Sequence, residues 1–124
     1  MSDGAAGKGL SPSARDDVRS SAGEVLFDLA HLSRQTMGDR ALESEILMLF
    51  SRQMEAVQSS VEAQGKAERL RMAHGLKGTA RGVGAVAIAD CAAAIEDAPD
   101  DAGPVSRLLR LIDESRAFIS AISR

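Results

Sequence analysis

The chain has 124 residues, 44% of them hydrophobic, which is enough for one domain with a single modest core. Trp and Tyr are absent and Phe occurs three times, so we expect the aliphatic core of a helical protein. The formal net charge of −3 argues against nucleic-acid binding, and the lack of a long apolar run argues against a membrane span. Cys91 is the single cysteine, which excludes an intrachain disulfide and favours a reducing cytoplasm.

Residues 1–20 are rich in Gly, Ser and Asp and show no apolar periodicity, which predicts a flexible N-terminal tail. Ser21 and Glu24 then have the spacing of a capping box, which is typical of a helix start. We therefore expect a short first helix that ends near Gly38. Its apolar residues are Val25, Leu26, Leu29 and Leu32.

Four further helices are predicted after this one. Asp39 can cap a long second helix, which the break at Gly65 ends. A third helix is expected over residues 66–83 and a fourth over 86–97, and the Pro- and Gly-rich turn at 99–104 precedes the last. The apolar residues of the second helix are Leu42, Ile46, Leu49, Phe50, Met54, Val57 and Val61. Those of the last helix are Val105, Leu108, Leu109, Ile112, Ile119 and Ile122.

No strand pattern and no internal repeat is found in the sequence. Since the connections are short, neighbouring helices are expected to run antiparallel. The sequence therefore predicts an all-α fold, a helical bundle over residues 21–124 that follows the tail.

His74 is expected to point away from the core. Each residue advances by about 100° around a helix, so the apolar side chains of the third helix fall about 160° to 240° from His74. These apolar residues are Met72, Leu76, Ala80 and Val83. A histidine that merely fills a core would lie on the same face as these residues.

Three glycines lie beside His74 on the same helix: Gly75, Gly78 and Gly82. Each glycine in a helix costs about 1 kcal/mol relative to alanine, so folding alone does not justify three of them. Gly78 lies one turn from His74, where a Cβ would obstruct another protein approaching the ring. We therefore expect that these glycines clear the surface for a partner.

Lys77 and Arg81 place positive charge one and two turns along from His74. A neutral imidazole nitrogen can attack phosphorus, and nearby cations stabilise a transferred phosphoryl group. The pattern indicates a histidine that accepts phosphate.

The segment over residues 73–80, AHGLKGTA, resembles the signature of histidine-containing phosphotransfer (HPt) domains, roughly His-x-Leu-Lys-Gly-[Ser/Ala/Thr]-[Ala/Ser]. Cys91 and the pair Ile95-Glu96 fit the continuation of the family pattern, which supports the resemblance over about residues 70–97.

The resemblance implies an antiparallel four-helix bundle with up-and-down connections, to which our reading adds the short N-terminal helix. It implies that His74 is the phosphorylated residue and that its Nε2 attacks. Lys77 would be the cation beside the phosphate, and Gly78 the residue that leaves room for the partner.

By the same resemblance, the protein would be a carrier in a multistep two-component phosphorelay. Phosphate would pass between His74 and the aspartates of receiver domains, fed by a hybrid sensor kinase. The module would have no ATP site and therefore not be an enzyme, and would hold no cofactor, since magnesium belongs to the receiver. A monomer is expected.

Five residues of the third helix are expected to contact the partner. Leu70 is the one large apolar residue on the outer face of this helix, and the others are Arg71, Gly75, Arg81 and Gly82.

Two alternatives remain open. One is a helical adaptor that binds a receiver or kinase without taking phosphate. The other, the dimerisation and phosphoacceptor domain of a sensor kinase, is disfavoured because Gly75 follows the histidine where those domains place an acidic residue. His31 is expected to be structural or solvated, and Cys91 to be a small buried hydrophobe. Two histidines without a matching cluster of acidic or Cys ligands predict no metal site.

Overall fold

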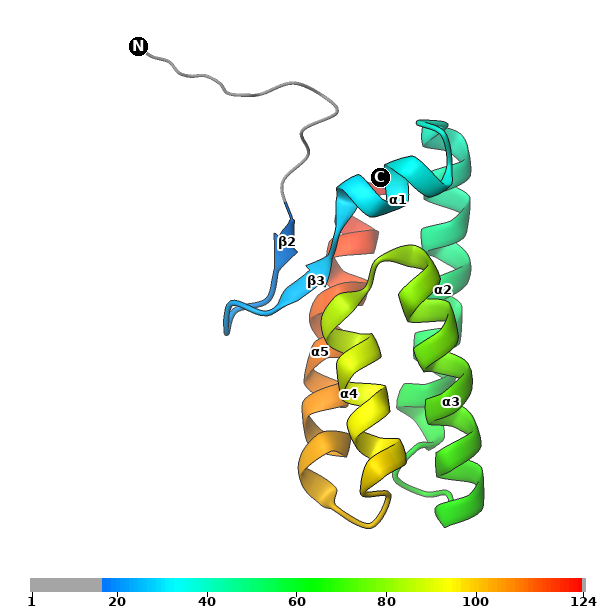
Figure 1. The fold of residues 1–124 in the computed structure, drawn as a ribbon, viewed down its shortest axis with the longest axis vertical. Helices are drawn as coiled ribbons and strands as arrows, with labels where there is room; N and C mark the ends of the chain where they lie inside the picture. The colour runs from blue at the N-terminus through cyan, green and yellow to red at the C-terminus, as the bar shows by residue number, and fades with distance from the viewer. Residues whose placement is uncertain (1–16, 124) are drawn as a thin grey trace.

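The computed structural model describes residues 17–123. Four long helices form an antiparallel up-and-down bundle, and a short helix lies across one end of it (Figure 1). The long helices are α2 (Arg40–Ser60), α3 (Lys66–Val83), α4 (Val86–Asp97) and α5 (Ala102–Ile122), and the short one is α1 (Leu29–Gln35). The predicted all-α bundle with an additional N-terminal helix is confirmed, with two short strands added, β2 (Val18–Arg19) and β3 (Val25–Phe27).

The predicted helix start at Ser21 is wrong, because residues 18–27 form an antiparallel hairpin in which Val18 pairs with Phe27. The Ser20 hydroxyl accepts hydrogen bonds from the amides of Ala22 and Glu24, at 3.2 and 3.0 Å, and so closes the turn. The Glu24 amide, which a capping box would bond to the Ser21 hydroxyl, is thereby taken by Ser20, and the Ser21 amide donates to Glu114 of α5 at 2.7 Å. The first helix therefore begins only at residue 29.

The N-terminal boundary of the folded part also differs from the prediction. Most of the predicted tail, residues 1–16, lies outside the described residues. Its last part belongs to the fold, since Val18 and Arg19 form β2 and Ser20 is buried.

Short polar and glycine caps explain where the helices begin and end. The carboxylates of Asp28 and Asp39 accept from the amides of His31 and Leu42, both at 3.0 Å, and so cap α1 and α2. Gly84 ends α3 in the left-handed conformation, with φ of 79°, and an added Cβ would meet the Asp28 carbonyl oxygen at 2.9 Å.

The last helix begins earlier than predicted. Asp101 caps α5 by accepting from the Gly103 amide at 2.9 Å, so Gly103 and Pro104 belong to the first turn and not to the preceding loop. Proline is tolerated there because the first amides of a helix have no partner within it. The predicted bounds of α3 and α4 are confirmed.

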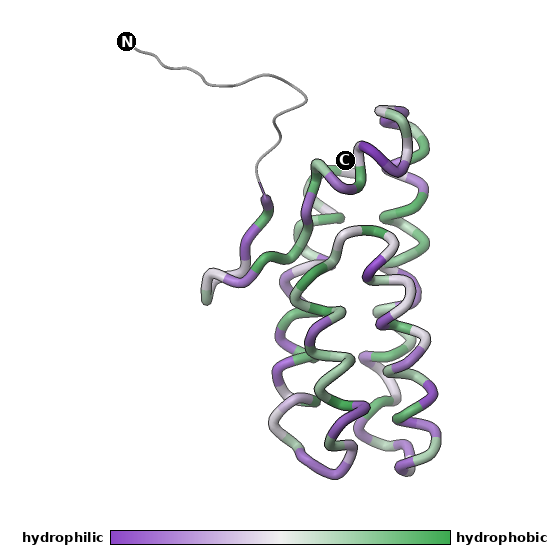
Figure 2. The backbone as a smooth tube through the Cα atoms, viewed as in Figure 1, coloured by the Kyte–Doolittle hydropathy of each residue, from purple (hydrophilic) through white to green (hydrophobic). Residues whose placement is uncertain are grey.

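The core lies between the four long helices, and apolar residues recur along each of them (Figure 2). The predicted apolar stripe of α2 is too wide: Leu42 and Leu49 are 39% and 58% exposed, whereas Leu47 is buried. On α5, Ile122 is exposed and Leu111 is fully buried instead. The remaining predicted core residues of these helices are buried or packed against the core.

A charged cluster fastens the hairpin turn to α5. The Glu24 carboxylate accepts from Arg107 Nε at 2.8 Å and from an Arg110 nitrogen at 2.9 Å. These two bonds lower the pKa of Glu24 from 4.5 to about 2. A depressed carboxyl pKa contributes stability above the unfolded value, and that contribution is lost as the pH falls from about 4.5 towards 2.

Glu24→Gln is expected to lower the free energy of unfolding at neutral pH by about 1–2 kcal/mol, because it removes two partly exposed charge-assisted bonds. The difference from wild type should shrink below about pH 4.5 and vanish near pH 2. Urea denaturation at several pH values measures it, with Glu45→Gln on exposed α2 surface as control. A deficit that does not change with pH would contradict the assignment.

Candidate functional site

His74 lies midway along α3 and points into solvent, as predicted. Its side chain is 75% exposed, whereas Leu76 and Ala80 on the opposite face are fully buried. The burial of that face fixes the rotation of α3 about its axis, and so fixes the direction of the imidazole.

Glu96 of α4 holds the ring. Its Oε2 lies 2.9 Å from His74 Nδ1, and its Oε1 forms an ion pair with Lys77 Nζ. The bond to Lys77, followed by that to His74, lowers the pKa of the Glu96 carboxyl. An ionised carboxylate only accepts hydrogen bonds, so Nδ1 is the donor, and in the neutral ring Nε2 is the nitrogen with the free lone pair. The site therefore offers a nucleophilic nitrogen in a defined tautomer.

Lys77 lies beside the ring, as predicted, but it is bonded to Glu96 and its side chain is only 20% exposed. The sequence reasoning attached little weight to Glu96. The helical spacing of α3 is enough to predict that Lys77 and Gly78 lie near His74. Glu96 is 22 positions further along the chain and reaches the ring only because α4 packs on α3. The sequence feature that could have indicated Glu96 is the apolar–acidic pair Ile95-Glu96. Because Ile95 is fully buried, Glu96 next to it is turned towards α3.

The three glycines of α3 leave open surface next to His74. A Cβ built on Gly75, Gly78 or Gly82 meets no heavy atom within 4 Å outside the local helix backbone. No packing contact in the described part of the chain requires glycine at these positions.

The residues predicted to contact a partner differ in their surroundings. Leu70 is half-buried, and Arg81 is exposed. Arg71 is also exposed but forms an ion pair with Glu68, one turn earlier. They share the helix of His74, and in the described structure none of them forms a hydrogen bond or ion pair with its ring.

An open groove runs between α2 and α3 beside the histidine. It has a volume of about 400 Å³ and includes Gly75, the residue after His74. Leu49 lies one turn from the groove residue Gln53, so the two side chains share a face of α2. The groove is lined by Gln53, Ala56, Val57 and Ser60 of α2 and by Glu68, Arg71, Met72 and Gly75 of α3.

The sequence could have indicated this surface. Measured from Phe50, the buried residues of α2 lie within about 60°, while Leu42 and Leu49 lie about 80° to 100° to one side. The sequence analysis assigned all the apolar residues of α2 to the core, and so did not separate Leu42 and Leu49 from the buried residues.

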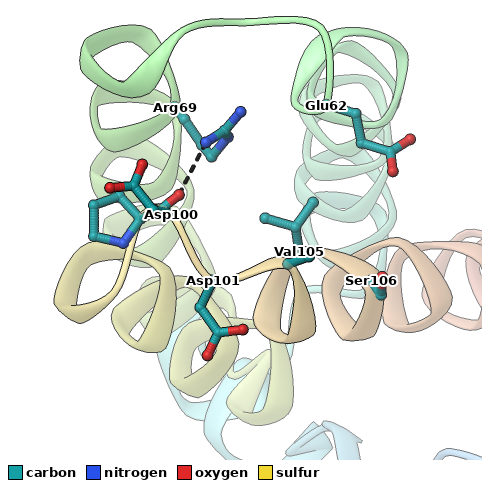
Figure 3. A pocket seen from close by; sticks show the side chains of 8 residues that line it. Glu62, Arg69, Asp100, Asp101, Val105 and Ser106 are labelled. Carbon is teal, nitrogen blue, oxygen red and sulfur yellow. Dashed lines mark hydrogen bonds between the residues drawn. The ribbon is translucent and has the colours of Figure 1, made fainter.

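A second pocket lies at the end of the bundle where α2 meets α3 and α4 meets α5 (Figure 3). Arg69 reaches into it, but its guanidinium already donates to the carbonyl oxygens of Val61, Gln64 and Pro99, at 3.2, 2.8 and 2.9 Å. These bonds join the α2–α3 loop to the α4–α5 loop, so Arg69 has a structural role.

The other histidine is structural, as expected. His31 Nε2 lies 3.1 Å from the Gly82 carbonyl oxygen, which joins α1 to the end of α3. Cys91 is buried, as predicted, and burial raises the pKa of its thiol. Within residues 17–123 there is no group of three or more His, Cys, Asp or Glu side chains arranged to hold a metal ion.

The exposed histidine, its carboxylate partner and the open glycine surface lie together on one side of a four-helix bundle. A sequence model described as Hpt domain matches residues 45–123, and the chain belongs to this family. The match covers α3, α4 and α5 and most of α2, and leaves out the hairpin and α1. No curated protein matches the chain, and neither does any solved structure. None of the described helices is long and apolar enough to cross a membrane.

Proposed function

We propose that the protein is the histidine phosphotransfer component of a multistep two-component phosphorelay and that it carries the phosphoryl group on His74 Nε2. The observation that carries this proposal is the exposed ring whose Nδ1 is held by Glu96, so that Nε2 faces the solvent. Membership of the Hpt domain family supports the class of function.

In the proposed reaction, the Nε2 lone pair attacks the phosphorus of an aspartyl phosphate in a receiver domain. The N–P bond forms as the O–P bond breaks, and its electron pair returns to the carboxylate. Lys77, one turn from His74, would turn from Glu96 to the phosphoryl oxygens and neutralise their charge. The partner would supply magnesium, and a hybrid sensor kinase acting in the cytoplasm would supply the phosphate.

Incubation with a phosphorylated receiver domain tests this function. We expect the protein to acquire label that is lost in acid and kept in alkali, as a phosphoramidate bond requires, and that maps to the tryptic peptide containing His74. A protein that binds the receiver without becoming labelled would be a helical adaptor and not a carrier.

The partner is proposed to dock on the groove between α2 and α3, with the exposed Leu49 at its edge. A standard protein interface has an apolar centre and a polar rim. On this side of α2, Leu49 and Ala56 are exposed, and α3 contributes Gly75 to the same groove. Docking there would place a receiver's phosphate over His74.

Leu49→Ala is expected to slow transfer from the receiver about tenfold at limiting receiver concentration, because it removes an exposed apolar contact worth about 1–2 kcal/mol. Folding stability should change by less than about 0.5 kcal/mol. Met48→Ala is the matched control, since Met48 faces α5, where its sulfur lies 3.6 Å from the Ser123 hydroxyl. Equal rates for the two variants would argue against docking on this groove.

Gly78→Ala is expected to raise the free energy of unfolding by about 1 kcal/mol, because the site is helical and its Cβ meets nothing. The same methyl group would stand in the partner's path, so transfer from a receiver should fall about tenfold. Labelling by phosphoramidate, a small donor, should be unaffected. Urea denaturation and the two labelling rates measure these effects; a more stable variant with full transfer from the receiver would show that Gly78 is not there for clearance.

A further inference from the structure

Among the described residues, Glu96 is the one that binds both the ring of His74 and the cation next to it. Oε2 lies 2.9 Å from Nδ1, while Oε1 pairs with Lys77, and the carboxylate is 22% exposed. The bond between Nδ1 and Oε2 does not involve Nε2, so it can persist when Nε2 is phosphorylated and Lys77 turns to the phosphoryl oxygens.

The proton on Nδ1 decides how well a phosphorylated ring donates. With Nδ1 protonated, the ring carries a positive charge and departs as neutral imidazole when the N–P bond breaks. Without that proton, the ring must depart as an imidazolate anion, which is a much poorer leaving group. In either case the N–P electron pair moves to Nε2 as the acceptor oxygen bonds to phosphorus.

We propose that Glu96 is a positioning residue that keeps the proton on Nδ1 of phosphorylated His74, so that the protein remains an efficient phosphoryl donor as the pH rises. This inference rests on the proposed function. A carboxylate in direct contact with a ring stabilises its cationic form. The lowered pKa of Glu96 supports this role, since the group stays ionised over the whole range in which the ring loses its proton.

The other charged groups around the ring do not supply this effect. On α3, Lys77 is bonded to Glu96, Arg71 is paired with Glu68, and Arg81 is a further cation; all three disfavour a positive ring. The groove residues that α2 contributes are uncharged. From α1, His31 is bonded to the Gly82 carbonyl oxygen, eight residues beyond His74. In the described structure, Glu96 is the single carboxylate that contacts the ring.

The test compares wild type with Glu96→Gln after phosphorylation of the full chain by phosphoramidate. Glutamine can still accept a hydrogen bond from Nδ1, so the substitution removes the charge and keeps the tautomer. Phosphorus NMR follows cleavage of the N–P bond between about pH 6 and 9, and His74→Gln corrects for phosphate elsewhere. We expect the two proteins to have equal cleavage rates near pH 6. Near pH 8 the rate of Glu96→Gln should be about tenfold lower, which corresponds to a shift of its pH profile by about one pH unit.

A second pair of variants separates the charge of Glu96 from its hold on Lys77. The pH profile of the cleavage rate should still differ between Lys77→Gln and the double variant Lys77→Gln/Glu96→Gln. The NMR shift of Nδ1 in the phosphorylated ring should keep its protonated value to higher pH in Lys77→Gln than in the double variant. Identical profiles within either pair would overturn the proposal. Wild type that accepts phosphate from phosphoramidate but from no receiver would contradict the proposed function instead.

Discussion

Replacing His74 with Gln is expected to abolish phosphoryl acceptance from a receiver domain, lowering the labelling rate by at least about a thousandfold. The reason is chemical: an amide has no nitrogen lone pair free to form the N–P bond. Because the His74 side chain is 75% exposed, its loss should change the free energy of unfolding by less than about 0.5 kcal/mol. Label incorporation and urea denaturation of the same preparation measure the two effects.

His31→Gln is the matched control for this experiment. His31 is bonded to the Gly82 carbonyl oxygen and serves to join α1 to α3, so its replacement should cost some stability and leave labelling intact. Acid-labile label that persists in His74→Gln, or that disappears in His31→Gln, would move the phosphorylated residue away from His74.

The spacing of apolar residues predicted the long helices because each of them buries a continuous stripe of side chains along one face. The bounds of α3 and α4 could be read directly, since glycine ends one and a buried apolar face defines the other. The outward direction of His74 followed from the same argument, because burying Leu76 leaves one orientation for a residue two positions away.

The parts that sequence reasoning missed depend on contacts between distant residues. Glu96 of α4 reaches the ring of His74 only because α4 packs on α3. In the hairpin, one serine hydroxyl binding two amides overrides a capping pattern that begins at the next residue. The spacing within one segment indicates which face of a helix is buried, but not which other segment its residues will contact.

The N-terminal hairpin contributes Leu26 and Phe27 to the core. Phe27 of β3 is fully buried and meets Phe50 of α2 edge-on, with ring centroids 6.2 Å apart. It also packs on Phe118 of α5, at 5.5 Å. The three phenylalanines of the chain thus gather at one place, although the family match begins only at residue 45. Aromatic pairs of this kind add to the free energy gained from burying their area.

Phe27→Ala is therefore expected to lower the free energy of unfolding by about 3–5 kcal/mol, a large part of the stability of a domain of this size. The folded fraction should still accept phosphate at His74, because that site is built from α3 and α4. Urea denaturation measures the loss, and Leu49→Ala, an exposed residue of similar character, should change stability little. A denaturation midpoint equal to that of wild type would mean that the hairpin does not pack on the bundle in solution.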